Sequence, residues 1–181
     1  MITGGISFNG NVTPYLSDEG FGPPTDDLTL AQSVVFGPSV VSEGGNGTFA
    51  AIPANTPVTM YSPLVINPPA LPVPATTPVW QVTVGPTTYS FTISGLSNYI
   101  EPVDNSAFMV LAMAGVVSDG TPSDDATGVF VATFTAEGGT SSWNGSFTTG
   151  GTLPVVPEPA SLGMLALGTL GLLRRRRSRV A

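Results

Sequence analysis

The chain has 181 residues, enough for one domain and an appendage, and its formal net charge at neutral pH is −7. It contains no His, Cys or Lys, and its five arginines all lie between 174 and 179, so residues 1–156 carry eleven carboxylates and no cationic side chain. Nucleic-acid binding needs Lys or Arg, disulfides and thiol chemistry need Cys, and catalytic triads need His. These functions are therefore excluded for residues 1–156.

Residues 1–153 alternate short runs rich in Val, Ile, Phe, Thr and Tyr with clusters of Gly, Pro, Asn and Asp, which is typical of strands and turns. We expect an all-β body, an antiparallel β-sandwich or jelly roll, with a barrel as the alternative. The predicted strands are Gly5–Asn9, Leu28–Phe36, Gly47–Ile52, Val58–Ser62, Val79–Val84, Tyr89–Ser94, Ala107–Val117, Gly128–Ala136 and Ser141–Thr148.

Two β-hairpins are predicted from the alternation of apolar and polar residues. The first joins residues 79–84 to 89–93 through the sequence Gly-Pro-Thr-Thr, which suits a tight turn. The second joins residues 129–135 to 142–147 across a Gly-Gly pair, and it places Trp143 on the apolar face.

A proline-rich segment at residues 62–78 interrupts this pattern with six prolines. Because proline donates no backbone hydrogen bond, we predict a sheet edge, a long connection or a polyproline II crossing. A role as a ligand for a peptide-binding domain is the less expected alternative.

The C-terminal segment differs from the body: residues 160–173 contain no charge, and Arg174–Arg177 follow directly. A helix of that length spans ~21 Å, short of the ~30 Å hydrocarbon core of a bilayer, so a buried core helix is one interpretation. The lack of a polar face and the arginine cluster instead favour insertion into a membrane, with the arginines inside and the body outside. A segment that barely spans suits a processing signal that is later removed.

A Pro-Glu-Pro motif, the apolar helix 160–173 and an arginine cluster at 174–179 follow one another at the extreme C-terminus. The motif and the cytoplasmic stop consist of Val156, Pro157, Glu158, Pro159, Arg174, Arg175, Arg176 and Arg177. In this order and spacing, residues 154–181 resemble the PEP-CTERM sorting signal of Gram-negative bacteria.

The resemblance implies that an integral-membrane exosortase recognises Pro157–Pro159 and that the tail is then removed. A single C-terminal transmembrane helix would hold the chain in the inner membrane only until that step. The body would then reach the outer surface or the extracellular matrix, where this family is often associated with exopolysaccharide production.

Residues 1–8 depart from the family pattern. They have neither the basic n-region nor the long apolar h-region of an N-terminal signal peptide. Either the start codon is placed too far downstream, which is the interpretation that we favour, or this chain is not exported.

Paired carboxylates, as in glycoside hydrolases, are the catalytic arrangement that the composition leaves open. The pairs are Asp18 with Glu19, Asp26 with Asp27, and Asp124 with Asp125. Each pair is adjacent in sequence and close to Gly, Pro or Ser, so we expect solvated turns and no enzyme.

A calcium site is the one candidate for a bound cofactor. The loop 119–125 contains three carboxylates, Asp119, Asp124 and Asp125, and carboxylate and carbonyl oxygens on loops are the ligands that Ca²⁺ prefers. The spacing does not match an EF-hand, and an ordinary acidic hairpin loop is the favoured interpretation.

Trp80 and Trp143 could stack on sugar rings, but the alternation favours core packing for both. We therefore expect a non-catalytic protein of the cell surface or extracellular matrix. A polysaccharide-binding module, with or without calcium, is the alternative, and a glycosidase is a weaker one.

Overall fold

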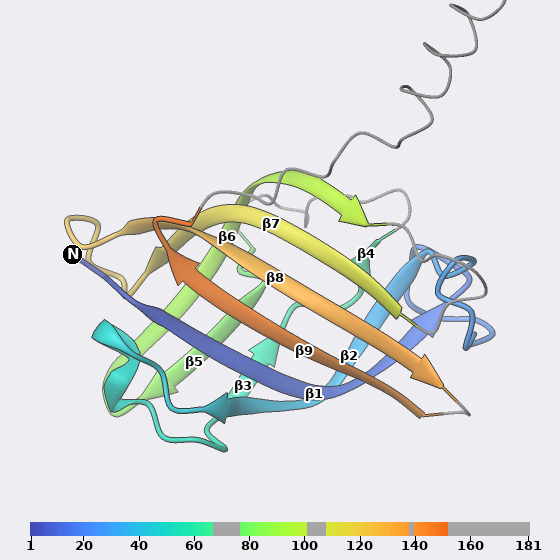
Figure 1. Ribbon diagram of the computed structural model, residues 1–181, viewed down its shortest axis with the longest axis horizontal. Helices are drawn as coiled ribbons and strands as arrows, with labels where there is room; N and C mark the ends of the chain where they lie inside the picture. The colour runs from blue at the N-terminus through green and yellow to red at the C-terminus, as the bar shows by residue number, and fades with distance from the viewer. Residues whose placement is uncertain (67–76, 101–107, 138–139, 152–181) are drawn as a thin grey trace, which may run out of the picture.

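The computed structural model describes residues 1–66, 77–100, 108–137 and 140–151. Nine strands and one short 3₁₀ helix, η1, lie in these ranges (Figure 1). Their bounds are β1 Gly5–Tyr15, β2 Ser33–Glu43, η1 Gly47–Ala51, β3 Pro57–Met60, β4 Leu64–Val65, β5 Trp80–Val84, β6 Thr87–Ile100, β7 Phe108–Ser118, β8 Ala126–Glu137 and β9 Thr140–Thr149.

The described strands form a closed antiparallel barrel. Neighbouring strands follow the order β1-β9-β8-β7-β6-β5-β3-β2, and β2 pairs back with β1 along the stretch from Ser7 to Tyr15, which closes these eight strands (Figure 1). The short β4 pairs with the beginning of β2, where Leu64 lies opposite Val34. The all-β prediction is confirmed, the predicted sandwich or jelly roll is wrong, and the alternative of a barrel is correct.

Two irregularities in β1 accompany the closure of the sheet. The register between β1 and β2 shifts between Ser7 and Phe8 and again between Gly10 and Val12. Such bulges bend a strand and increase its local twist, which curves a sheet toward closure. Inward and outward side chains alternate in the same way in a sandwich and in a barrel, so the sequence pattern could not separate the two.

Residues 47–52 were predicted to form a strand, but they form η1 and its C-terminal cap. Gly47 adopts a φ of 60°, in the left-handed region that glycine enters readily. Phe49 and Ile52 are both buried, and residues three apart lie on the same side of a 3₁₀ helix. The burial of these two side chains explains the apolar pattern that suggested a strand.

Both predicted hairpins are present, but the first turn has two residues, where the sequence predicted four. β5 and β6 meet across Gly85 and Pro86, and Gly85 has the positive φ, 57°, that a type II′ turn requires at its first central residue. In the second hairpin, Trp143 on β9 lies opposite Phe134 on β8. Of the proline-rich segment, part forms β4 along β2, and residues 67–76 lie outside the described residues.

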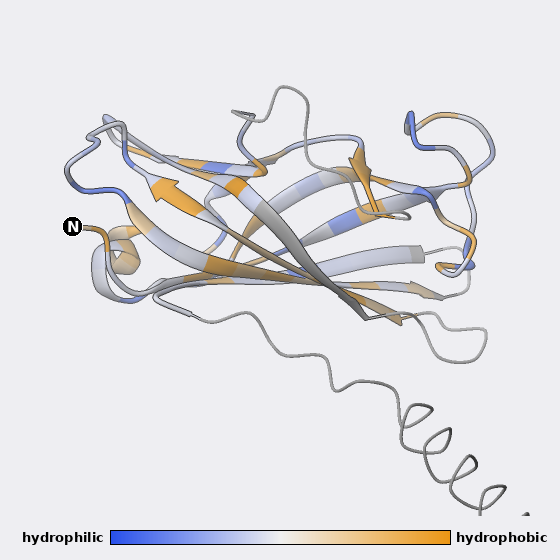
Figure 2. Cartoon of the chain, turned by 90° about the horizontal axis from the view of Figure 1, so that it is seen from above, coloured by the Kyte–Doolittle hydropathy of each residue, from blue (hydrophilic) through white to orange (hydrophobic). Residues whose placement is uncertain are grey.

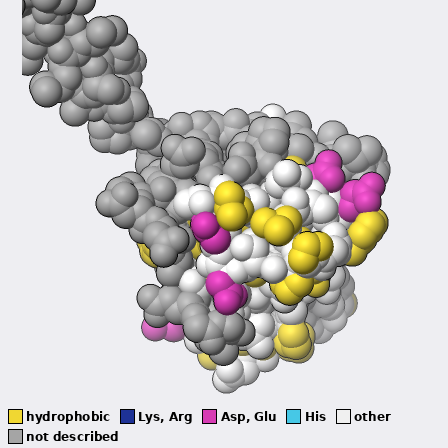
Figure 3. All heavy atoms as spheres, turned by 90° about the vertical axis from the view of Figure 1, so that its right-hand side faces the viewer, with side chains coloured by type: hydrophobic (Ala, Val, Ile, Leu, Met, Phe, Trp, Pro, Cys, Tyr) yellow, Lys and Arg dark blue, Asp and Glu magenta, His cyan; other side chains and the backbone are white. Residues whose placement is uncertain are grey.

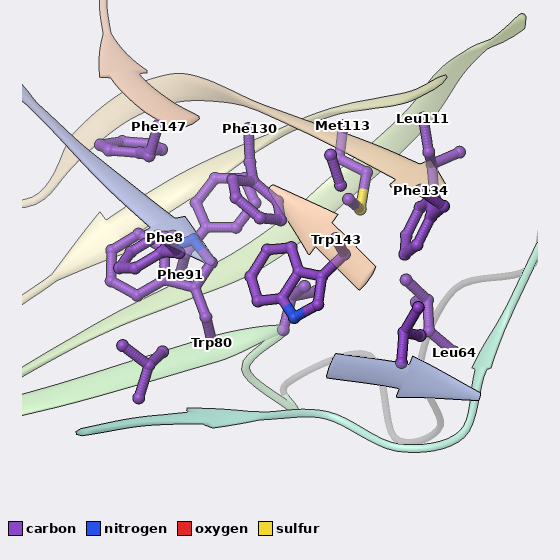
Figure 4. Close-up of a cluster of buried hydrophobic side chains, with 14 of the residues drawn as sticks. Phe8, Leu64, Trp80, Phe91, Leu111, Met113, Phe130, Phe134, Trp143 and Phe147 are labelled. Atoms are coloured by element: carbon purple, nitrogen blue, oxygen red, sulfur yellow. The ribbon is translucent and has the colours of Figure 1, made fainter. Parts of the chain in front are cut away.

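An aromatic cluster fills the barrel (Figure 4). Phe8 and Trp80 lie with their ring centroids 5.0 Å apart, Phe91 and Phe147 5.2 Å apart, and each of these four side chains is at most 1% exposed. Centroid separations of this size are the favourable range for aromatic pairs. A barrel of eight strands is just wide enough for side chains to fill it, so the interior acts as a hydrophobic core.

Inward-facing glycines make room for these rings. A Cβ at Gly128 would come within 2.5 Å of the Phe147 ring, and one at Gly145 within 2.6 Å of the Phe130 and Trp143 rings. Small residues opposite large ones allow the core to reach the packing density of protein interiors. Gly128 on β8 and Gly145 on β9 are therefore required for the packing of the core.

Candidate functional site

An uncharged polar wall covers the outer faces of β1, β9 and β8. Asn9 on β1 lies opposite Asn144 on β9, which lies opposite Thr133 on β8. Asn11, Ser142 and Thr135 form a second polar row, whereas the row of Ser7 and Ser146 ends on β8 at the half-exposed Val131. The wall consists of Ser7, Asn9, Asn11, Thr133, Thr135, Ser142, Asn144 and Ser146, all exposed or half-exposed. Their amides and hydroxyls repeat at ~4.8 Å across the strands and ~6.7 Å along them.

Two shallow hollows lie on this wall on either side of Asn144. One of about 250 Å³ is bordered by Ser7, Thr133 and Ser146. The other, of about 270 Å³, is bordered by Asn9 and other residues of β1, β2 and β9. Both hollows offer amide and hydroxyl groups and, among the described residues that line them, no carboxylate, so they can form hydrogen bonds but cannot supply an acid or base.

The carboxylate pairs are divided between the two ends of the barrel. The pairs at 18–19 and 26–27 lie in the β1–β2 connection, whereas 124–125 lies in the β7–β8 connection at the opposite end. Because the strands between them have 10 or 11 residues, roughly 30 Å separates the two groups. Asp18, Glu19 and Asp26 are exposed in surface turns, as the sequence predicted.

The candidate calcium ligands do not converge. Asp119 accepts a hydrogen bond from the backbone N–H of Thr121, and Asp124 accepts one from the N-terminal ammonium of Met1 at 2.7 Å. Within the described ranges, no group of three acidic side chains is placed to hold a metal ion. The calcium site at Asp119, Asp124 and Asp125 thus gains no support from this geometry and stays a prediction.

Both tryptophans belong to the core, as predicted. Trp80 and Trp143 are fully buried, and the indole N–H of Trp143 donates to the Ser39 hydroxyl at 3.2 Å. They are therefore not available to stack on a sugar ring at the surface.

The polar wall itself was missed by sequence reasoning. The alternation of Ser142, Asn144 and Ser146 with apolar residues was visible in β9. What the sequence did not reveal was that β1 pairs with β9, which joins the first and last strands into one surface. The alternation within β9 was a local signal for an outward polar face. The pairing register between β1 and β9, which extends that face into a wall, could not be inferred from it.

The Pro-Glu-Pro motif, the apolar segment 160–173 and the arginine cluster lie outside the described residues. Across the ranges that are described, no helix has the length and apolar character needed to cross a membrane. Searches of curated proteins and of solved structures found no match to the chain.

A comparison with protein families does match the tail: the PEP-CTERM protein-sorting motif aligns with residues 155–177. The match confirms the resemblance drawn from the order of the motif, the apolar segment and the arginines. Residues 155–177 are therefore a PEP-CTERM protein-sorting motif, which implies export, association with the cell surface of a Gram-negative bacterium and processing by an exosortase.

Proposed function

We propose that this chain is a non-catalytic component of the cell surface or extracellular matrix, delivered there as a compact β-barrel. The sorting motif at residues 155–177 is the observation that carries the destination. The filled barrel has no substrate chamber in its interior, where packed rings such as Trp80 and Phe91 lie, and this supports a non-catalytic role. The described carboxylates lie in separate groups at the two ends of the barrel, which gives no convergent acid–base pair across it.

Intact-mass spectrometry of the protein recovered from its native host tests this proposal. We expect a mature form in the extracellular or outer-surface fraction that ends near Pro157–Pro159 and lacks Arg174–Arg177. An uncut form in the cytoplasm would contradict the proposed destination. Release of reducing sugar from the host polysaccharide in proportion to added protein would contradict the non-catalytic role.

Polysaccharide binding is a second candidate function, favoured by the polar wall. Side-chain amides and hydroxyls without formal charge match the hydroxyl groups of a neutral polysaccharide, and Asn144 borders both hollows. An anionic polysaccharide fits less well, because the described residues supply carboxylates at both ends of the barrel and no cationic side chain. This candidate does not require calcium.

We predict that the double change Asn9→Ala and Asn144→Ala weakens binding to neutral polysaccharide from the host matrix by about tenfold, since each lost hydrogen bond contributes about 0.5–1.5 kcal/mol. Affinity electrophoresis with the polysaccharide in the gel, with and without a calcium chelator, measures this. The matched control is Thr83→Ala with Thr88→Ala, which removes an exposed hydroxyl pair on β5 and β6, outside the wall. Equal retention of the wall and control variants would rule out the wall as the binding surface.

A further inference from the structure

Large apolar side chains are exposed together at the end of the barrel that carries the β1–β2 connection. Leu16, Phe21 and Leu30 are 40%, 66% and 59% exposed, and all three belong to residues 16–32. Phe108, 52% exposed, begins β7 at the same end. Isolated exposed apolar residues are ordinary, but several gathered on one connection indicate a contact surface. Figure 3 views this end and shows hydrophobic side chains beside carboxylates.

The connection that carries these side chains is ordered by its own hydrogen bonds. The backbone N–H of Leu16 donates to Pro23, that of Thr25 to Pro14, and that of Leu30 to Asp27. Leu28 and Ala31 are fully buried and anchor the connection to the core. Because Leu16, Phe21 and Leu30 stand on a fixed backbone, a partner that contacts them pays little additional loop entropy.

The connection that carries the apolar side chains is also rich in carboxylates. Asp18, Glu19, Asp26 and Asp27 lie in the same 17-residue segment, which mixes hydrophilic and hydrophobic residues in Figure 2. The chain has no Lys, and its arginines all lie at 174–179. A second copy of the body, a nucleic acid or an anionic membrane would therefore meet like charge, whereas a basic surface would meet opposite charge.

A groove of about 340 Å³ continues this surface onto the barrel. The end of β1 contributes Val12 and Pro14, the connection contributes Pro24 and Asp26, and β9 contributes Ser141. The groove is thus lined by both apolar and polar residues, and Asp26 adds a carboxylate. It is suited to receive an aliphatic side chain whose neighbour is Lys or Arg.

We propose that the β1–β2 connection, with Leu16, Phe21 and Leu30 at its centre and Asp18, Glu19, Asp26 and Asp27 around them, is a docking surface for a basic protein segment. The segment would place aliphatic residues on Phe21 and Leu30 and in the groove, and Lys or Arg on the surrounding carboxylates. This goes beyond the proposed surface or matrix role, because it assigns the chain a protein partner and the partner its chemistry.

Fluorescence anisotropy tests the proposal with full-length protein in non-ionic detergent and two short labelled peptides. The peptides share the same leucines, but one carries lysines and the other glutamates at the remaining positions. We expect only the lysine peptide to bind, and we expect Phe21→Ser to weaken it by about tenfold, as is usual for a central aromatic contact. Asp18→Asn combined with Asp26→Asn should also weaken it.

Asp119→Asn combined with Asp125→Asn is the matched control, because it removes the same charge at the opposite end of the barrel and should change the affinity less than about twofold. Phe21 is highly exposed, so its replacement should leave the thermal unfolding midpoint nearly unchanged. Equal weakening by the two charge variants would overturn the proposal, since it would show nonspecific attraction. Unchanged peptide binding by Phe21→Ser would also overturn the proposal. The same holds if sedimentation shows that the natural chain is a dimer and that Phe21→Ser is a monomer, since the partner would then be a second copy of the chain.

Discussion

Replacement of Pro157, Glu158 and Pro159 by alanine is expected to leave the chain uncut and held in the inner membrane. The three residues form the centre of the motif that matches at 155–177, upstream of the apolar segment. Alanine lacks both the proline ring and the glutamate carboxylate, so the triple change removes the side chains that define the motif. Intact mass and membrane fractionation should show a species that retains Arg174–Arg177, with the mature form reduced to background.

The control for this change is Thr169→Ala, which keeps the motif, the arginines and the apolar length of the tail. It should be processed like the natural chain. A complementary change of Arg174–Arg177 to serine removes the charges that hold a segment end in the cytoplasm, and it should lower processing by a different route. Normal cleavage of the triple alanine variant would show that the sequence Pro-Glu-Pro is not what the processing enzyme reads.

Several strands were predictable from local patterns, either alternation of apolar and polar residues or, in β7, a continuous apolar run. The predicted strand Leu28–Phe36, by contrast, shares only residues 33–36 with β2. The predicted strand Ala107–Val117 corresponds to β7 at Phe108–Ser118, and Gly128–Ala136 falls within β8 at Ala126–Glu137. Alternation with a period of two is a local property of the chain, and it does not depend on which strands pair with one another. The turn at Gly85 was local in the same sense, since a Gly-Pro pair between two alternating runs defines it.

Closure was not predictable, because it depends on which distant strands meet. β1 pairs with β9 on one side and with β2 on the other, and nothing in residues 5–15 alone specifies either partner. The same long-range pairings create the polar wall and place Phe21 and the Asp119 loop at opposite ends. The tail shows the opposite case: its motif is read from consecutive residues, and it was identified from sequence alone.

In the core of the barrel, Trp143→Ala is expected to lower the free energy of unfolding by about 3–5 kcal/mol, the usual range for removal of a fully buried aromatic side chain. Trp143 is completely buried and packs against Phe36 and Phe130, with ring centroids 5.0 Å and 6.3 Å away. Its indole N–H also donates to Ser39, a bond that joins β9 to β2 over Gly10 of β1, the strand between them. Denaturant unfolding followed by circular dichroism measures the loss.

A comparison of Trp143→Phe with Trp80→Phe separates the hydrogen bond from the lost volume. Both tryptophans are fully buried, so the same truncation leaves similar cavities. The indole N–H of Trp80, however, has no hydrogen-bond partner among the described residues, and removal of an unpaired buried donor recovers about 1–3 kcal/mol. Trp143→Phe also loses the Ser39 bond, which contributes about 0.5–1.5 kcal/mol, so it should be more destabilising than Trp80→Phe by about 1.5–4.5 kcal/mol. Equal losses would mean that the Trp80 indole finds a partner in solution, such as a buried water, and that the Ser39 bond adds nothing beyond packing.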